Sequence, residues 1–167
     1  NTLHSRGKRV IAEVLIPGEL LEKTMGVTAE VLFKARQINQ VGSFMAGTSS
    51  TGAHAANGIA AVFIATGQDA ANVAESSASI IYADIDEAGN YYLSVTLPSL
   101  IIATYGGGTG LATQQECLNI LDCNGTGKVH KLAEIIGATV LAGEVSLMSA
   151  VLAGDWVTSH DALGRNR

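Results

Sequence analysis

An α+β fold is predicted by the irregular alternation of strand-like and helix-like segments along these 167 residues. A β-branched run over 9–16 stops at Pro17, and two further extended segments, 77–85 and 91–97, flank a turn-forming stretch at 87–90. Apolar stretches with helical spacing separate and follow these segments. A doubly wound parallel sheet requires regular alternation of strands and helices, so we expect α+β instead.

Helices are expected at 19–25, 29–38, 53–66, 111–121 and 129–153, the last being one helix or two in sequence, with a short helix at 155–160. Thr28 is suited to cap the second of these, and Gly67 to end the third. The 53–66 helix is apolar nearly all round, so we expect a central helix buried on all sides. The Gly-, Ser- and Thr-rich stretch 42–52 is read as a loop, and Pro98 as the end of its strand.

The long apolar stretch 137–157 is compatible with either a membrane span or a core helix. Glu144 lies near its middle, and an acid at the bilayer centre costs about 2.5–3.5 kcal/mol on insertion scales. Three glycines in the stretch suit close packing against other helices. We therefore expect long C-terminal helices that belong to the protein core.

Composition and charge restrict the function. The net charge of −5 argues against a nucleic-acid surface, which needs a basic stripe. Cys117 and Cys123 have neither a disulfide-framework nor a metal-ligand spacing, and no zinc motif is present, so a reduced, cytoplasmic setting and no metal are expected. The chain starts at Asn1 without a leader and ends without a tail, and we expect it to be a fragment of a longer protein.

Two glycine-containing segments could carry chemistry. Gly67-Gln68-Asp69 ends the apolar helix, and a glycine with positive φ would turn the chain sharply and aim the acid outward. An acid at a desolvated turn can have a shifted pKa, or can shift the pKa of a neighbouring lysine. Gly106-Gly107-Gly108-Thr109 precedes a helix, whose N-terminus favours negative charge. The alternatives are that Asp69 only caps the next turn, and that the glycines form a flexible turn, because the dinucleotide and P-loop spacings are absent.

Two histidines have possible roles. His54 and Asn57 share one face of the apolar helix, where polar groups need partners, so they are either ligand-facing residues or a satisfied core pair. His160 is a surface residue or a general acid, since imidazole titrates in the range that suits proton transfer.

Taken in order, these segments resemble the C-terminal part of the catalytic domain of class I 3-hydroxy-3-methylglutaryl-CoA (HMG-CoA) reductases, over nearly all of the chain. The matching segments are Arg6-Gly7-Lys8, Val41-Gly42-Ser43, Met45-Ala46-Gly47, His54-Ala55-Ala56-Asn57, Gly67-Gln68-Asp69-Ala70, Pro98-Ser99, Gly106-Gly107-Gly108-Thr109, Leu141-Ala142-Gly143-Glu144, Ser146-Leu147-Met148, Ser159-His160 and Arg165. No single segment is decisive, but their number and order are specific. The resemblance implies that residues 1–167 are a partial large, substrate-binding domain without the small cofactor-binding domain.

The resemblance also implies a reaction and roles for particular residues. Enzymes of this family reduce HMG-CoA to mevalonate and CoA with a nicotinamide cofactor, usually NADPH, with NADH as an alternative. Asp69 matches the catalytic aspartate, in a network with a lysine and a glutamate that precede Asn1, and His160 matches the general acid for the CoA thiolate. Substrate-side positions match Ser43, His54, Asn57, Leu147 and Val151, and cofactor-side positions match Gln68, Gly106, Gly107, Gly108, Thr109 and Arg165.

Further expectations follow from the same resemblance. The isolated chain should be inactive, and the full enzyme should be a homodimer or larger assembly in the cytosol of a microbe, with any membrane anchor outside this segment. Some positions depart from the family pattern, among them Ile38, where many members have a substrate-contacting lysine, and Trp156 and Asp161 beside His160. The alternatives left open are a divergent NADH-preferring or catabolic relative and a non-catalytic CoA-binding paralogue.

Overall fold

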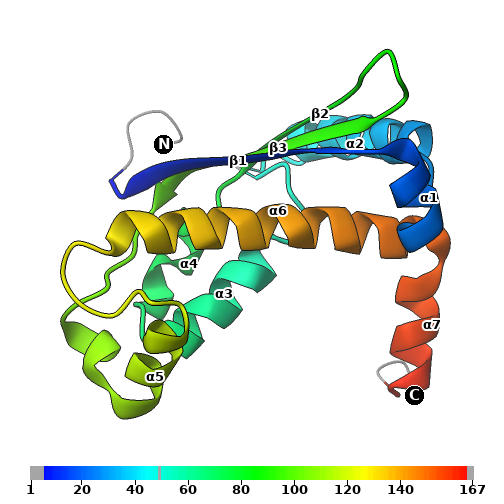
Figure 1. The fold of residues 1–167 in the computed structure, drawn as a ribbon. Coiled ribbons are helices and arrows are strands. Elements are labelled where there is room, and N and C mark those ends of the chain that lie inside the picture. The colour runs from blue at the N-terminus through cyan, green and yellow to red at the C-terminus, as the bar shows by residue number, and fades with distance from the viewer. Residues whose placement is uncertain (1–5, 49, 165–167) are drawn as a thin grey trace.

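The computed structural model describes residues 6–48 and 50–164 and confirms the α+β class. Its elements are, in chain order, β1 (Lys8–Ile16), α1 (Gly18–Met25), α2 (Ala29–Met45), α3 (Ala55–Thr66), the 3-10 turn η1 (Ala70–Asn72), α4 (Val73–Ser76), β2 (Ile80–Ile85), β3 (Tyr91–Leu100), the 3-10 turn η2 (Gly107–Gly110), α5 (Ala112–Ile120), α6 (Val129–Ala153) and α7 (Asp155–Ala162). In Figure 1 the sheet lies on one side of α6, and α3, α4 and α5 lie on the other.

The sheet is antiparallel and has the order β1-β3-β2. Alternate residues of its strands, such as Val10, Ile81 and Leu93, are buried on the face that α2 and α6 cover, whereas Ile11 and Tyr82 lie on the exposed face. This period-2 pattern is that of a sheet with one solvated face. The expected hairpin is present, and Asp86 holds its turn by accepting hydrogen bonds from the backbone N–H groups of Ala88 and Asn90.

The expectation that Pro98 ends the second strand of the hairpin is wrong, because β3 continues to Leu100. The pairing of β3 with β1 shifts by one residue between the pairs Lys8–Leu100 and Val10–Leu97, so Pro98 lies in a bulge. The pairing of β3 with β2 ends at Thr96. A residue without an N–H group is tolerated at such a position.

The helix expected at 29–38 is longer than predicted and ends at Met45, so the loop expected at 42–52 is helical in its first residues. Gly42 and Ser43 are weak helix formers, but propensity is readily overridden by tertiary contacts. The preceding turn is fixed by two such contacts: the Asn39 side chain donates a hydrogen bond to the Thr51 carbonyl, and the Gln40 side chain to the Ile81 carbonyl. Thr28 caps the helix as predicted, since its hydroxyl accepts a hydrogen bond from the Val31 N–H.

Helix α3 lies centrally between α6, α5 and α4, but the expectation that it is buried on all sides is wrong. Ile59 and Phe63 are fully buried, whereas Ile64 on the opposite face is 71% exposed. The sequence has apolar residues on both faces, and composition alone does not indicate which face packs within this chain. Gly67 ends the helix in the left-handed conformation, as predicted.

Among the residues that the structure describes, α6 is the one helix with the length and hydropathy of a membrane span. A core helix passes the same test, and α6 packs against the sheet and α3, with Leu132, Ile136 and Val140 fully buried. Its single mid-helix acid, Glu144, is also fully buried and paired, so α6 lies in the core as expected.

Candidate active site

The two glycine-containing segments predicted to carry chemistry lie against each other. Gly67 has φ of +68°, and a Cβ on it would lie 2.2 Å from the Gly108 carbonyl oxygen. Conversely, a Cβ on Gly108 would lie 2.6 Å from the Gly67 carbonyl oxygen. Side chains cannot be accommodated at these separations, so glycine at both positions allows the turn after α3 to meet the loop before α5.

Gln68 joins the same two segments through its side-chain amide. Its Nε2 donates to the Ala103 carbonyl at 2.9 Å, and its Oε1 accepts from the Ala103 N–H at 2.8 Å. A side chain that pairs with both backbone groups of one residue fixes the position of the segment leading into the triple-glycine loop. In this structure Gln68 therefore supports the loop, and its cofactor-binding role stays a prediction.

Asp69 is exposed and caps η1, which was one of the two interpretations of its position. Its Oδ1 accepts from the Ala71 N–H at 3.0 Å, and its Oδ2 accepts from the Asn72 side-chain amide at 3.4 Å. The Asn72 Oδ1 in turn accepts from the Arg6 guanidinium at 3.0 Å. The cap orients the carboxylate and leaves it accessible, so the capping role does not oppose the predicted catalytic one.

The triple-glycine loop itself is largely open. Gly106, Gly107 and Gly108 are exposed, and a Cβ on Gly106 or Gly107 would meet nothing within 4 Å. Thr109 is buried, and its hydroxyl donates to the Gly106 carbonyl at 2.6 Å, closing the η2 turn. A ligand can therefore approach the backbone at the first two glycines, while Thr109 holds the shape of the loop.

His54 precedes α3, with its ring between two glycines. A Cβ on Gly58 would lie 2.6 Å from the ring Cε1, and a Cβ on Gly143 of α6 would lie 2.0 Å from the ring Nδ1. The Nδ1 atom is buried without a hydrogen-bond partner. Asn57, on the same helix, is exposed, and Ser43, expected in a loop, lies half-buried in the last turn of α2.

A buried ion pair lies directly behind His54. The Arg36 Nη1 is 3.1 Å from the Glu144 Oε2, and both side chains are almost entirely buried. The Glu144 carboxylate also accepts hydrogen bonds from the N–H groups of Ala53, His54 and Ala55, at 3.0, 2.7 and 3.2 Å. A carboxylate at these orphan donors neutralises the positive end of the α3 dipole.

This pair was not predicted as a part of the site. Glu144 entered the sequence predictions as the acid within the apolar stretch and as a member of one family-matching segment, and no role was predicted for Arg36. The available signal was a charged residue on the buried side of an otherwise apolar helix, since such a charge requires a partner. Tyr91 lies beside the pair: burial raises the pKa of its phenol, and the nearby Arg36 guanidinium opposes that rise.

An apolar cavity of about 510 Å³ adjoins the α3 N-terminus. Its lining residues come from α2, α6, α7 and the residue before His54: Ala35, Ile38, Asn39, Ala53, Leu147, Met148, Val151, Leu152 and Trp156. Leu147 and Val151, two of the predicted substrate-side residues, thus line one apolar wall, and their contact with a substrate stays a prediction. Ile38 and Trp156, two of the departures from the family pattern, line the same cavity.

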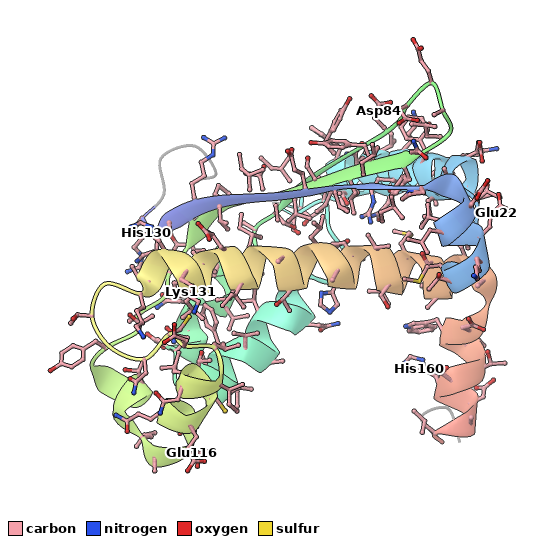
Figure 2. The ribbon with its side chains drawn as sticks, in the orientation of Figure 1. Glu22, Asp84, Glu116, His130, Lys131 and His160 are labelled. Carbon is pink, nitrogen blue, oxygen red and sulfur yellow. The ribbon has the colours of Figure 1, made fainter. Side chains whose placement is uncertain are left out.

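His160 lies on α7, where its Nδ1 is 2.6 Å from the Trp156 carbonyl oxygen and its ring centroid is 4.1 Å from that of the Trp156 indole. Figure 2 shows His160 beyond the C-terminal end of α6, whereas Glu116 of α5 and Lys131 of α6 lie at the opposite end. The Asp69 turn contacts the loop that leads into α5. The described residues therefore do not bring Asp69 and His160 together, and Arg165 lies outside them.

No group of three His, Cys, Asp or Glu side chains within residues 6–48 and 50–164 could hold a metal ion. The arrangement instead offers an exposed carboxylate, an open glycine backbone and an apolar cavity beside a histidine. These are features of a site for an organic ligand with both charged and apolar parts.

Comparisons with known proteins agree on one family. The model of the hydroxymethylglutaryl-coenzyme A reductase family matches residues 1–165. A 3-hydroxy-3-methylglutaryl-coenzyme A reductase of Methanothermobacter thermautotrophicus is 45% identical over 166 residues, which are 99% of this chain and 42% of the relative. The corresponding values for the reductase of Methanocaldococcus jannaschii are 43%, 99% and 41%.

A plant relative, reductase 1 of Arabidopsis thaliana, is 41% identical over 175 residues, covering 99% of this chain and 30% of its own length. The chain thus spans about two fifths of the length of the archaeal relatives, at 42% and 41%. The family model covers nearly every residue, including the Asp69 turn, the triple-glycine loop and the α6–α7 segment. The chain therefore belongs to the hydroxymethylglutaryl-coenzyme A reductase family.

Proposed function

We propose that this protein reduces HMG-CoA to mevalonate and CoA with NADPH, and that residues 1–167 are the C-terminal portion of its large, substrate-binding domain. The single observation that carries the proposal is the packing of the Asp69 turn against the triple-glycine loop in a chain that matches the family over residues 1–165. The contact joins the turn that carries an exposed carboxylate to a loop with an exposed backbone, which suits a site where a thioester carbonyl and a cofactor meet.

The glycine loop fits a bound nicotinamide cofactor, because open space lies beside Gly106 and Gly107. Gly106, Gly107, Gly108 and Thr109 would hold the cofactor, with Gln68 fixing the loop and Arg165 contributing near the cofactor phosphate. When bound, the cofactor supplies the two hydrides. Cofactor choice between NADPH and NADH depends on groups outside these contacts, and both cofactors belong in the assay.

The chain's own residues would handle charge and protons. Asp69 would hold the charge of a neighbouring lysine that stabilises the developing oxyanion. When the carbon–sulfur bond breaks, His160 would give its proton to the departing CoA thiolate and prevent its return to the aldehyde. His54, Asn57 and Ser43 would contact the substrate, and Leu147 and Val151 would pack against its apolar part in the cavity.

The separation of Asp69 from His160 in this chain supports a site completed by other elements. We propose that the working enzyme is a homodimer or larger assembly in the microbial cytosol, with a lysine and a glutamate supplied by sequence outside residues 1–167. The isolated 167-residue polypeptide should then be inactive. Steady NADPH oxidation by that polypeptide with HMG-CoA would contradict this part of the proposal.

Asp69→Asn in the full-length enzyme tests the central role. The amide oxygen of asparagine can still accept the Ala71 N–H, so the backbone cap is preserved, and the negative charge is lost together with the long hydrogen bond from the Asn72 amide. We expect turnover to fall by several orders of magnitude with an unchanged melting temperature. Glu87→Gln, an exposed carboxylate on the β2–β3 turn, is the matched control and should leave turnover unchanged. Near-normal turnover of Asp69→Asn would contradict the catalytic role of Asp69, whereas a full-length wild type without turnover would favour a non-catalytic CoA-binding protein.

His160→Gln tests the proton donor separately. Thioester reduction needs a proton for the leaving thiolate, whereas reduction of added mevaldehyde does not. We expect loss of the first reaction with partial retention of the second, both followed by cofactor absorbance. Equal loss of the two half-reactions would count against His160 as the general acid.

A further inference from the structure

We propose that Glu144 is a positioning residue for His54. Its carboxylate, held by Arg36, fixes the first turn of α3 so that the His54 ring carries its proton on Nε2 and acts as a hydrogen-bond donor through that atom. The ligand-facing part of this proposal rests on the proposed function; the positioning and the tautomer do not.

Glu144 caps the N-terminus of α3. Glu144 on α6 binds three consecutive backbone N–H groups, of Ala53, His54 and Ala55, and the shortest of these hydrogen bonds is the one from His54 itself. The N–H groups of His54 and Ala55 are orphan donors at the start of α3, since they have no backbone partner within the helix. The backbone of His54 is therefore held by a side chain from another helix, through both carboxylate oxygens.

Arg36 is the counter-charge of Glu144. Arg36 on α2 donates to the Glu144 Oε2 at 3.1 Å and lies near the Glu144 carbonyl oxygen at 3.5 Å. A buried carboxylate without a cation would be strongly unfavourable. Arg36 thus supplies the counter-charge of the Glu144 carboxylate and helps to hold it against the start of α3.

Two glycines form a narrow slot that holds the His54 ring. Gly58 and Gly143 flank the imidazole so closely that a methyl group on either would overlap it. Gly143 precedes Glu144 directly, so one turn of α6 both holds the His54 backbone and forms one wall of its slot. A small movement of that turn would displace the ring.

The surroundings of the His54 Nδ1 atom favour one tautomer of the ring. The Nδ1 atom is buried and has no acceptor. A buried N–H without an acceptor costs about 1–3 kcal/mol. A Cβ on Gly143 would lie 2.0 Å from Nδ1, so a Cα–H of Gly143 points at this nitrogen. A proton on Nδ1 would meet that hydrogen, whereas a bare Nδ1 lone pair faces it favourably. The proton therefore lies on Nε2, and the Nε2–H is the group that can bind an oxygen of a ligand.

The test is the nitrogen NMR signature of His54 in the full-length protein, labelled with nitrogen-15 at histidine and assigned by its absence in His54→Gln. We expect the wild type to show an unprotonated Nδ1 and a protonated Nε2. The double variant Arg36→Met/Glu144→Gln removes both charges together, which avoids the unfolding expected when one charge is left unpaired. We expect it to stay folded, with His54 averaging between the two tautomers.

Two comparisons separate positioning from general stability. Glu134→Gln changes an exposed acid on the same helix and should leave the His54 signals and activity unchanged. In the double variant we expect kcat/KM for HMG-CoA to fall by up to about 10²-fold, as small displacements of site groups can do. A wild-type signature with the proton on Nδ1, or unchanged His54 signals in the folded double variant, would overturn the proposal.

The spectroscopic readout needs no substrate. Failure of the proposed function would appear as a wild type inactive with HMG-CoA but with the expected His54 signature. Failure of this inference would appear as an active enzyme whose His54 signature does not depend on Glu144. The two outcomes are therefore distinguishable.

Discussion

The Nη1 of Arg36 lies 3.1 Å from the Oε2 of Glu144, and the side chains are only 2% and 0% exposed. The other ion pairs within the described residues, Arg6–Glu75, Lys128–Asp122 and Lys131–Asp122, are at least partly exposed. Burying two charges is favourable only when further hydrogen bonds satisfy them. The N–H groups at the α3 N-terminus do so for the Glu144 carboxylate, whereas the Arg36 Nε is buried without a hydrogen-bond partner. The pair links α2, α3 and α6 at the point where the cavity and His54 meet.

Arg36→Met should therefore destabilise the protein by about 3–5 kcal/mol, because it leaves the Glu144 carboxylate buried without a cation. Arg6→Met removes the surface pair with Glu75 and should cost about 0–1 kcal/mol, making it the matched control. Urea unfolding followed by circular dichroism measures both. Similar losses from the two variants would show that the buried pair is not specially important for stability.

Gly67→Ala should destabilise the protein by about 2–4 kcal/mol, through left-handed strain together with overpacking. The added Cβ would overlap the Gly108 carbonyl, which is backbone and cannot rotate away. Gly89→Ala has a similar positive φ of +80° but meets nothing within 4 Å, so it reports the strain alone. Thermal melting of both variants gives the difference due to contact; equal shifts would mean that the two loops do not pack as described.

Local signals in the sequence predicted much of this fold. Thr28 as a cap, Gly67 as a helix end and the 87–90 turn depend on backbone needs that one or two residues satisfy, and all three are confirmed. The packing of the Asp69 turn on the glycine loop joins two segments to which the family resemblance gave roles in one site, which is long-range information that no local signal carries.

Features that depend on partners in space were not predictable in this way. The end of α2 is fixed by contacts of Asn39 and Gln40 with distant backbone, and the pairing of Arg36 with Glu144 joins residues 108 positions apart. The exposed face of α3 was misjudged because apolar residues occupy both faces, and nothing local shows which face this chain covers. The relative position of His160 and Asp69 depends on how α7 leaves α6, which no short motif specifies.

The exposed acid Asp122 should make stability depend on pH in a defined window. Hydrogen bonds from Lys128 and then Lys131 lower the pKa of its carboxyl from 3.8 to about 2. A folded-state pKa below the unfolded one stabilises the protein above the unfolded pKa, and this contribution is lost as the pH falls from 3.8 towards 2. Wild type should therefore exceed Asp122→Asn in stability near neutral pH, and the difference should vanish over this window. A difference in urea midpoints that stays constant across the window would contradict the assignment.

The two cysteines should differ sharply in reactivity. Cys123 is fully buried, burial raises the pKa of its thiol, and its Sγ lies 3.4 Å from the Leu121 carbonyl oxygen. The thiolate is the reactive form, so both the raised pKa and the lack of access slow its alkylation. Cys117 on α5 is only partly buried.

Iodoacetamide at neutral pH, followed by peptide mass spectrometry, should modify Cys117 first and Cys123 only when the segment around it opens. Adding urea below the unfolding midpoint should accelerate labelling of Cys123 far more than that of Cys117, because only Cys123 requires opening. Equal alkylation rates of the two cysteines in native buffer would contradict the burial of Cys123 in the loop between α5 and α6.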